Sequence, residues 1–270
     1  MEIWQAVLLG IIQGITEWFP VSSSGHLVLT KHFLDIEPSL FFDVFIHFGS
    51  AIVVLFIFRK DVKDVIVSFF SALIESPESG LKAFTKTGKR KLATYIIIGS
   101  IPTGIIGLLV SIYYEGFFSD PIIVGIALLV TGIVLLTTKD KDGKKTEEYM
   151  DTKDALSVGF MQGLASIPGI SRSGFTISAS LDRGIERETA ARYSFLLFLP
   201  AITAAGILKI TDLPKGENPD LMILMIGTIT AMLVGYITIK ALLALIRKGE
   251  FYKFSIYCFA VGIIVILLSI

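Results

Sequence analysis

One pattern of residues occurs twice in the chain, 149 positions apart, and it constrains the fold more than any other feature. The copies cover residues 10–26 and 159–174 and align without a gap. Half of the identical positions are glycines, which are frequent in membrane helices, so chance similarity is the alternative interpretation. We interpret the pattern as an internal repeat. Its identities pair Gly10, Gln13, Gly14, Ser22, Ser24 and Gly25 with Gly159, Gln162, Gly163, Ser171, Ser173 and Gly174.

Each copy of the repeat predicts a helix, a break and a second helix. Pro20 interrupts the first copy, because proline lacks an N–H group and disfavours helix in the residue before it. The serines after it are good N-cap residues for a helix that begins near Gly25. Residues 24–34 are too few to cross a bilayer core, which needs about 20 helical residues. We therefore predict re-entrant hairpins over 2–34 and 154–183, with breaks that line a cavity.

The composition indicates an integral membrane protein. The 270 residues are 53% hydrophobic and 18% charged, with a mean hydropathy of +0.74. Soluble proteins average about 25% charged residues. The net charge is zero, which gives no electrostatic argument for a nucleic-acid partner. Cys258 is the only cysteine, so no disulfide can form within the chain.

The apolar runs predict an all-α protein with six transmembrane helices beside the two re-entrant helical hairpins. The chain, 1–270, is expected to form a single membrane domain, with one repeat over about 1–138 and the other over about 154–270. A polar basic segment (59–91), a tight loop (115–120) and a charged loop (139–153) join the elements. The predicted spans are 40–58, 92–114, 121–138, 188–210, 220–246 and 251–270.

The distribution of Lys and Arg predicts the orientation. Segments 59–91, 139–153, 183–192 and 247–253 hold eight, five, three and three of these residues, all on one predicted side. The opposite side holds Lys31, Lys209 and Lys215. The positive-inside rule places the basic side in the cytoplasm and hence both termini outside. Each repeat has one hairpin and three spans, so the second copy is inverted. In such an inverted-topology repeat the two breaks meet near the midplane, where substrate sites occur.

The residues at the two breaks predict an anion site. Two helix N-termini, near Gly25 and Gly174, would offer free N–H groups and a partial positive charge. Arg172, found only in the second copy, adds a planar fork that suits phosphate oxygens. We predict a phosphate or diphosphate pocket within the membrane. The substrate-binding candidates besides Arg172 are Gln13, Ser22, Ser24, Gly25, Ser171, Ser173 and Gly174.

Glu17 is the candidate for both metal binding and proton transfer. Gln13 lies four residues before it on one helix face, and the two can offer oxygens to Mg²⁺ or Ca²⁺. Glu17 can instead act as a general base for a serine hydroxyl or for water. His26 follows Ser23 by three residues, so the two can form a Ser–His pair for nucleophilic attack. His26 can also protonate a leaving group.

Several polar or small residues have purely structural interpretations. Gln13 and its repeat mate Gln162 can tie helices together, and the paired glycines of each copy are expected to allow close helix packing. Residues 182–187 are expected to form a solvated turn. A local pair, one turn apart, is expected between Asp43 and His47.

Three motifs in this chain resemble the undecaprenyl-diphosphate phosphatase family, the integral-membrane type linked to bacitracin resistance. Residues 13–17 resemble its (E/Q)-x-x-x-E motif, residues 20–26 its P-V-S-S-[ST]-G-H motif and residues 168–174 its P-G-x-S-R-S-G motif. Residues 42–49 are similar to a further family stretch, and the resemblance covers essentially the whole chain. Gln13 stands where many members have Glu, which weakens the prediction of metal binding at this position.

The resemblance implies hydrolysis of a polyprenyl diphosphate, undecaprenyl diphosphate, to the monophosphate and inorganic phosphate. This reaction recycles the lipid carrier of cell-envelope glycans. The resemblance also implies a divalent cation and a site that opens toward the outer face of the cell membrane. It assigns the acidic motif role to Glu17 and the phosphate-gripping role to Arg172. The motif's serine and histidine fall on Ser23 and His26, and the choice of nucleophile among Ser23, His26 and water stays open.

Two other functions are compatible with the pattern. Inverted repeats and broken helices are typical of transporters, so a transporter or flippase of a phosphorylated lipid or small anion is the alternative. A regulatory or resistance-associated membrane protein is a weaker one. The enzyme is favoured because Glu17, the serines and His26 lie in one copy while Arg172 lies in the other. The sequence allows a homodimer and leaves the oligomeric state open.

Overall fold

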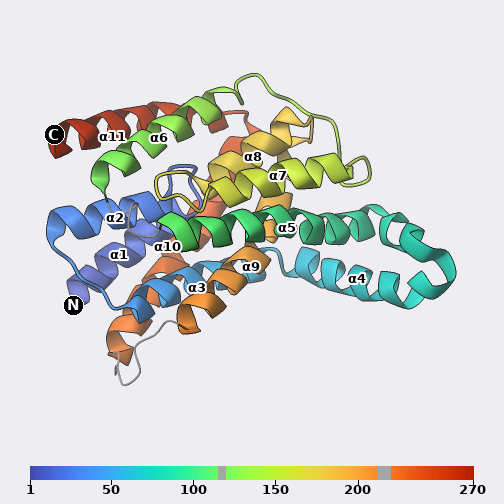
Figure 1. The fold of residues 1–270 in the computed structure, drawn as a ribbon, viewed down its shortest axis with the longest axis horizontal. Coiled ribbons are helices and arrows are strands. Elements are labelled where there is room, and N and C mark those ends of the chain that lie inside the picture. The colour runs from blue at the N-terminus through green and yellow to red at the C-terminus, as the bar shows by residue number, and fades with distance from the viewer. Residues whose placement is uncertain (115–119, 212–219) are drawn as a thin grey trace.

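The computed structural model describes residues 1–114, 120–211 and 220–270, which fold into helices joined by short connections (Figure 1). Within these residues extended pairing is confined to one isolated bridge between Lys145 and Ile185. The prediction of an all-α protein is confirmed. The α-helices are α1 (Ile3–Thr16), α2 (Ser23–Leu34), α3 (Leu40–Ile57), α4 (Arg59–Ser79), α5 (Gly88–Tyr114), α6 (Pro121–Leu136), α7 (Thr152–Leu164), α8 (Arg172–Asp182), α9 (Arg187–Thr211), α10 (Leu221–Arg247) and α11 (Phe254–Ser269), and two short 3-10 helices are η1 (Gly80–Thr85) and η3 (Phe251–Lys253).

Five of the described helical segments are long and apolar enough to cross a membrane: Leu40–Ile57, Gly88–Tyr113, Arg187–Lys209, Leu221–Arg247 and Phe251–Ser269. They match five of the six predicted spans. The sixth, expected over 121–138, forms α6, which has only 16 residues. At 1.5 Å per residue it extends about 24 Å, less than a hydrocarbon core of about 30 Å. Most of the predicted loop 115–120 lies outside the described residues, as does Lys215.

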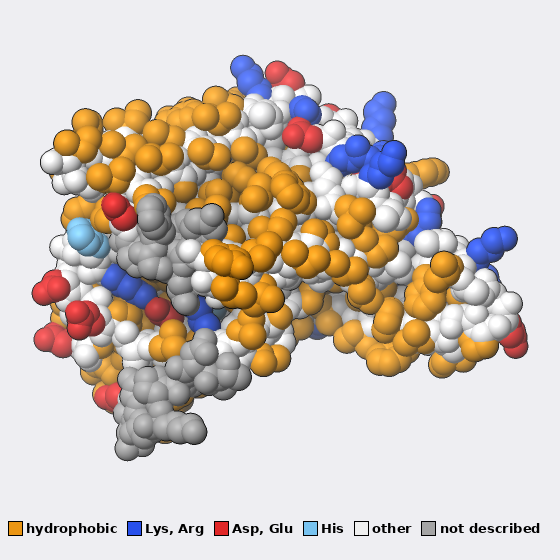
Figure 2. Space-filling model, viewed as in Figure 1, with side chains coloured by type: hydrophobic (Ala, Val, Ile, Leu, Met, Phe, Trp, Pro, Cys, Tyr) orange, Lys and Arg blue, Asp and Glu red, His pale blue; other side chains and the backbone are white. Residues whose placement is uncertain are grey.

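The outer surface is apolar over the middle of the molecule. Figure 2 shows hydrophobic side chains covering this zone, while Lys and Arg gather toward the right of the view. The exposed residues include Phe56 on α3, Ile105 on α5, Ile237 on α10 and Leu267 on α11. Soluble monomers seldom expose contiguous apolar patches beyond a few hundred Å². This belt is typical of a surface in contact with lipid.

The two repeat copies fold as helix pairs, α1–α2 and α7–α8, with breaks over residues 17–22 and 165–171. The first helix of each pair packs through its glycines on a helix of the other half. A Cβ on Gly10 of α1 would lie 2.6 Å from the carbonyl oxygen of Gly227 on α10. A Cβ on Gly159 of α7 would overlap the Gly99 carbonyl of α5. The predicted packing role of these glycines is confirmed.

Helix α9 lies at the centre of the buried core. It contacts α3, α5, α8 and α10. Tyr193, Phe195 and Leu197 on α9 are fully buried, together with Trp18 from the first break. The Tyr193 hydroxyl donates to the Tyr95 carbonyl of α5 over 2.7 Å, so its polar atom is satisfied inside the core. This packing fixes the first break against the middle of the molecule.

The basic segment 59–91 contains helix α4, which sequence analysis left unassigned. Helices α4 and α5 and η1 form an arm that extends to the right in Figure 1. The ion pairs Lys89–Asp64 (2.6 Å) and Arg90–Glu75 (2.7 Å) hold the two helices of the arm together.

Arg183 lies in the predicted solvated turn over 182–187 with its side chain 36% exposed, but it also binds a buried carboxylate that the sequence did not indicate. Its Nε atom donates to Asp154 Oδ1 over 2.7 Å, and Asp154 is fully buried at the start of α7. Lys145 Nζ lies 3.3 Å from the same carboxylate. A buried carboxylate needs such partners, because an unpaired buried charge is very costly. Asp182 is solvated as predicted and pairs with Lys141 at the surface.

Candidate active site

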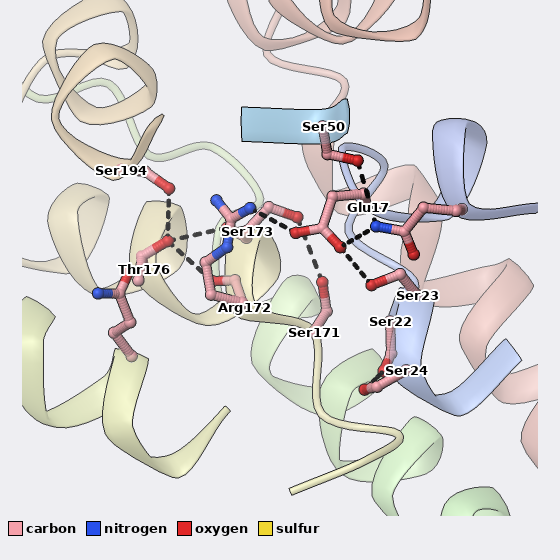
Figure 3. Close-up of polar contacts among 12 residues, drawn as sticks. Glu17, Ser22, Ser23, Ser24, Ser50, Ser171, Arg172, Ser173, Thr176 and Ser194 are labelled. Atoms are coloured by element: carbon pink, nitrogen blue, oxygen red, sulfur yellow. Dashed lines mark hydrogen bonds and ion pairs between the residues drawn. The ribbon is translucent and has the colours of Figure 1, made fainter. Parts of the chain in front are cut away.

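The two breaks meet inside the protein. The backbone N–H of Gly169 in the second break donates to the Ser22 hydroxyl in the first over 3.0 Å. A Cβ on Gly25 would lie 3.0 Å from the Gly169 Cα, so the close approach needs glycine at position 25. Figure 3 shows the polar side chains of both breaks facing one another. The predicted meeting of the two motifs is thus observed as a set of direct contacts.

The helices after the two breaks begin in the same way. Ser22 caps α2 by accepting from the Gly25 N–H (3.2 Å), and Ser171 caps α8 by accepting from the Gly174 N–H (3.1 Å). The helices therefore begin at Ser23 and Arg172, two residues before the predicted starts. The cap hydroxyls also lie 3.3 Å from those of Ser24 and Ser173, respectively. Both cap hydroxyls are engaged in holding helix starts.

Glu17 is the centre of a buried hydrogen-bond network that spans the two halves. Its Oε2 atom accepts from the Ser23 hydroxyl over 2.5 Å and from Gln13 Nε2 over 3.0 Å. Its Oε1 atom accepts from Arg172 Nη2 over 2.8 Å, across 155 positions of sequence. Of the four predicted catalytic residues, Glu17 therefore contacts two directly, Ser23 and Arg172 (Figure 3).

Arg172 is held by aromatic rings and keeps one donor free. Its guanidinium lies 4.1 Å from the ring centroid of Phe198 and 5.6 Å from that of Trp18. Such cation–π contacts stabilise a desolvated guanidinium. While Nη2 binds Glu17, the buried Nη1 atom has no hydrogen-bond partner within the described part of the chain. A buried unpartnered donor of this kind indicates a place for a ligand acceptor.

The comparison with known proteins agrees with this geometry. A model of the family described as "Bacitracin resistance protein BacA" matches residues 6–264. The chain belongs to this family. It is similar over 99% of its length to an undecaprenyl-diphosphatase of Desulforapulum autotrophicum, with 47% identity and 98% of that protein covered. It is also similar to proteins of that name from Halothermothrix orenii (46% identity, 100% of this chain, 99% of the relative) and Korarchaeum cryptofilum (44%, 98% and 99%). The apolar helices and the family together identify an integral membrane protein.

Membership of the BacA family confirms the resemblance predicted from the motifs, but the structure corrects two predicted contacts. Ser23 and His26 do not form a pair, because Ser23 donates to Glu17 while both ring nitrogens of His26 are bonded elsewhere. Nor do the Asp43 and His47 side chains pair: the Asp43 carboxylate binds Lys31 at 2.6 Å, and His47 Nδ1 meets the Asp43 backbone carbonyl at 2.7 Å. The side chains of Ser23 and Asp43 bind residues 6 and 12 positions away, whereas each histidine bonds the backbone carbonyl of the residue four positions before it.

The donor atoms beside Glu17 are of the kind that a hard divalent cation binds. The Gln13 Oε1 atom is buried and has no partner among the described residues, so a hard-cation ligand is available beside Glu17. No group of three His, Cys, Asp or Glu residues that could hold a metal ion occurs in the described ranges. Mg²⁺ commonly binds through one or two carboxylates together with substrate phosphates and waters, and this donor set matches that mode.

Sequence reasoning missed several residues that hold the site in place. Ser50 accepts from Gln13 Nε2 over 3.2 Å, and the Thr131 hydroxyl donates to the Gly169 carbonyl over 3.0 Å. Thr176 and Ser194 share a hydrogen bond of 2.6 Å between α8 and α9. For these residues the sequence shows only a hydroxyl within a largely apolar segment. Such a hydroxyl does not indicate which group it will bind. Tyr257, which contacts His26, gave no signal at all.

Proposed function

We propose that this protein is an undecaprenyl-diphosphate phosphatase, which hydrolyses the lipid diphosphate to the monophosphate and inorganic phosphate and so recycles the carrier of cell-envelope glycans. The observation that carries this proposal is the Glu17 carboxylate, which binds both Ser23 (2.5 Å) and Arg172 (2.8 Å) where two helix N-termini meet. The relatives that bear the name undecaprenyl-diphosphatase support it along the whole chain.

The diphosphate binds between Arg172 and the first turns of α2 and α8. The first amides of a helix have no intrahelical partner and favour negative charge. The free Nη1 atom of Arg172 donates to a phosphate oxygen while Nη2 keeps its bond to Glu17. The rings of Phe198 and Trp18 fix the orientation of the guanidinium group, so that Nη1 can make this contact.

Ser23 supplies the hydroxyl that attacks the terminal phosphorus, and Glu17 accepts its proton. The bond from that phosphorus to the bridging oxygen breaks, which releases the lipid monophosphate and leaves a phosphoserine. Water then hydrolyses the phosphoserine and releases inorganic phosphate. The Ser23 Oγ–H group already donates to Glu17 Oε2 over 2.5 Å, which is the contact that a general base makes with the nucleophile it activates. The choice of Ser23 over His26 rests on this contact. In this assignment His26 acts as a base on the water that completes the reaction.

Gln13 Oε1 and Glu17 would hold a Mg²⁺ or Ca²⁺ ion, which when bound would neutralise the charge of the diphosphate. The unpartnered Gln13 oxygen supports this assignment. Metal binding without substrate is expected to be weak, because Arg172 already compensates the charge of Glu17.

The two halves form an inverted-topology repeat with six spans and two re-entrant hairpins. The reciprocal packing of α1 on α10 and of α7 on α5 supports this arrangement, and α6 would be its short sixth span. Both ends of the chain lie at the same end of the molecule, away from most Lys and Arg residues (Figures 1 and 2). The termini and the opening of the site then face outside. A homodimer stays a prediction.

The test is phosphate release from a C55 polyprenyl diphosphate by the purified protein in detergent, with and without Mg²⁺ or Ca²⁺. Arg172→Ala should lose release by at least about 100-fold, in the range that follows loss of an oxyanion contact. Arg247→Ala is the matched control, since Arg247 is exposed and pairs with Glu188. Release that survives Arg172→Ala would refute the site. Absence of release from well-folded protein that still binds phospholipid anions would favour the transporter.

A further inference from the structure

His26 is fixed by hydrogen bonds at both ring nitrogens. Its Nδ1 atom lies 2.8 Å from the Ser22 carbonyl oxygen, and its Nε2 atom lies 2.8 Å from the Tyr257 hydroxyl on α11. A carbonyl oxygen can only accept, so Nδ1 carries a proton. In the neutral ring Nε2 then has a lone pair and accepts the Tyr257 O–H. The two contacts together specify a single tautomer.

Tyr257 is placed to hold this arrangement from one side of the first break. Its ring stacks on the His26 ring with a centroid distance of 5.7 Å and an interplanar angle of 17°. Tyr257 also forms part of the wall of a cavity of about 410 Å³ between the first break and α11. The rest of that wall is largely apolar, with Ile15 from the end of α1 and Phe19 and Val21 from the break. Tyr257 is 44% exposed, and its hydroxyl is bonded to His26.

We propose that Tyr257 is a positioning residue for the reaction, which acts by fixing the tautomer and the orientation of His26. This inference rests on the proposed function of the site. Tyr257 itself does not touch the reacting atoms. Its hydroxyl keeps Nε2 unprotonated until a water takes the place of the phenol at this nitrogen, while Ser22, which also caps α2, keeps Nδ1 protonated. The motif histidine therefore meets the substrate in one defined state, because a residue from a distant helix holds it.

The first test reads the tautomer directly and needs no activity. The chain has three histidines, so ¹⁵N-histidine labelling gives few signals, and the His26 signals are identified by their loss in His26→Gln. The wild-type protein should show one His26 tautomer with Nδ1 protonated. In Tyr257→Phe, which keeps the ring and removes the hydroxyl, the Nε2 signal should shift because this nitrogen loses its donor. The imidazole, no longer held from α11, should also leave the Ser22 carbonyl part of the time and populate the second tautomer. An unchanged His26 spectrum in Tyr257→Phe would overturn the proposal.

The second test links the tautomer to turnover. Tyr257→Phe should lower kcat about 5- to 50-fold, part of the 10²–10⁴ that positioned proton transfer contributes, with KM changed less than about twofold. Tyr236, whose hydroxyl bonds Lys240 on α10, provides the control. The kcat of Tyr236→Phe should match that of wild type. In a His26→Gln background, Tyr257→Phe should have no further effect, because both changes remove one function.

The outcomes separate this inference from the proposed function. Additive losses in the double variant would overturn the link between Tyr257 and His26, as would a wild-type kcat in Tyr257→Phe. If wild-type protein released no phosphate, the proposed function would fall. The tautomer measurement would still report whether Tyr257 positions His26.

Discussion

At the scale of single residues, Glu17 and Arg172 are buried opposite charges. They bind each other, and this bond leaves a donor of Arg172 without a partner among the described residues. Removing one partner of such a pair leaves an uncompensated charge, which typically costs about 3–5 kcal/mol. The pair therefore serves binding as well as stability: Arg172 Nη1 stays unpartnered until an anion arrives. The aromatic rings beside it decide where that donor points.

Replacement of Phe198 by leucine tests this role of the rings. Phe198→Leu keeps an apolar side chain but removes the ring 4.1 Å from the guanidinium, so kcat/KM should fall about 3- to 30-fold, as expected for loss of about 0.5–2 kcal/mol. Phe195→Leu is the matched control, since Phe195 lies on the same helix and packs edge-on against Trp18, whereas the guanidinium lies over the rings of Phe198 and Trp18. Equal losses in the two variants would show that Phe198 contributes only packing.

Gln13 offers a second prediction at this scale, concerning the cation. Gln13→Glu replaces the amide that donates to Glu17 by a second carboxylate. The second carboxylate raises the affinity of the site for a hard cation and destabilises the site when no cation is bound. The Mg²⁺ concentration for half-maximal phosphate release should fall at least about fivefold. Gln5→Glu, on the same helix near its start, controls for an added charge. An unchanged half-maximal concentration would remove position 13 from the metal site.

Sequence alone predicted the residues whose burial is costly and missed those that gain their role from a partner. Glu17 and Arg172 were found because ionisable groups inside apolar segments are expensive and hence functional. The pairing of Ser23 with Glu17 was one of two alternatives, and the alternative Ser–His pair was wrong. The contact of His26 with Tyr257 spans 231 positions of sequence, and no local spacing rule can predict it.

At the scale of elements, hydropathy predicted the long apolar helices but not how the polar ones fold. The span expected over 121–138 became a shorter helix because α6 ends at Leu136, where Thr137 and Thr138 turn the chain. Helix α4 was missed because its residues are mixed in polarity and include Pro77. Pro77 lies in the last turn of the helix, and the Leu73 carbonyl that its missing N–H leaves free accepts from the Ser76 hydroxyl over 2.9 Å.

The glycine contacts between helices give a prediction about stability. Gly159→Ala would drive a methyl group into the Gly99 backbone of α5, and overpacking of this kind costs about 1–3 kcal/mol. The melting temperature in detergent should therefore fall by about 3–10 °C. Gly104→Ala, on α5 in open space, should leave it within about 2 °C. A melting temperature for Gly159→Ala equal to that of Gly104→Ala would contradict the observed closeness of α5 and α7.

The arm formed by α4, η1 and α5 has a predicted acid limit. Hydrogen bonds from Lys86 and Arg90 lower the pKa of Glu75 from 4.5 to about 2. Because the folded-state pKa is depressed, the stabilisation is complete above pH 4.5 and is lost as the pH falls toward 2. Hydrogen exchange of the arm, corrected for intrinsic rates, should speed up over this range in wild type. In Glu75→Gln the arm should already exchange faster at pH 7, while Glu78→Gln should behave as wild type.

At the scale of the whole molecule, the two halves share a frame but not their chemistry. The correspondence at 149 positions continues past the helix pairs, where Ile36 and Glu37 match Ile185 and Glu186. Ile36 and Ile185 are both buried, as expected if each anchors the end of its helix pair in the same way. Only the first half carries Glu17 and only the second carries Arg172, so neither half is complete without the other. A site of this kind exists only if the halves are fixed relative to each other.

The inverted arrangement that we propose predicts that the ends of the two helix pairs face opposite sides of the membrane. Glu37 lies just after α2, Glu188 lies in the first turn of α9 just after the second pair, and both are exposed. A membrane-impermeant maleimide added to intact cells should label Glu37→Cys, and it should label Glu188→Cys only after permeabilisation. The native Cys258 is fully buried and should stay unlabelled, so the unmodified chain is the control. Labelling of both variants from outside would refute the inversion, and it would also remove the reason for two helix N-termini to converge from opposite faces on one anion.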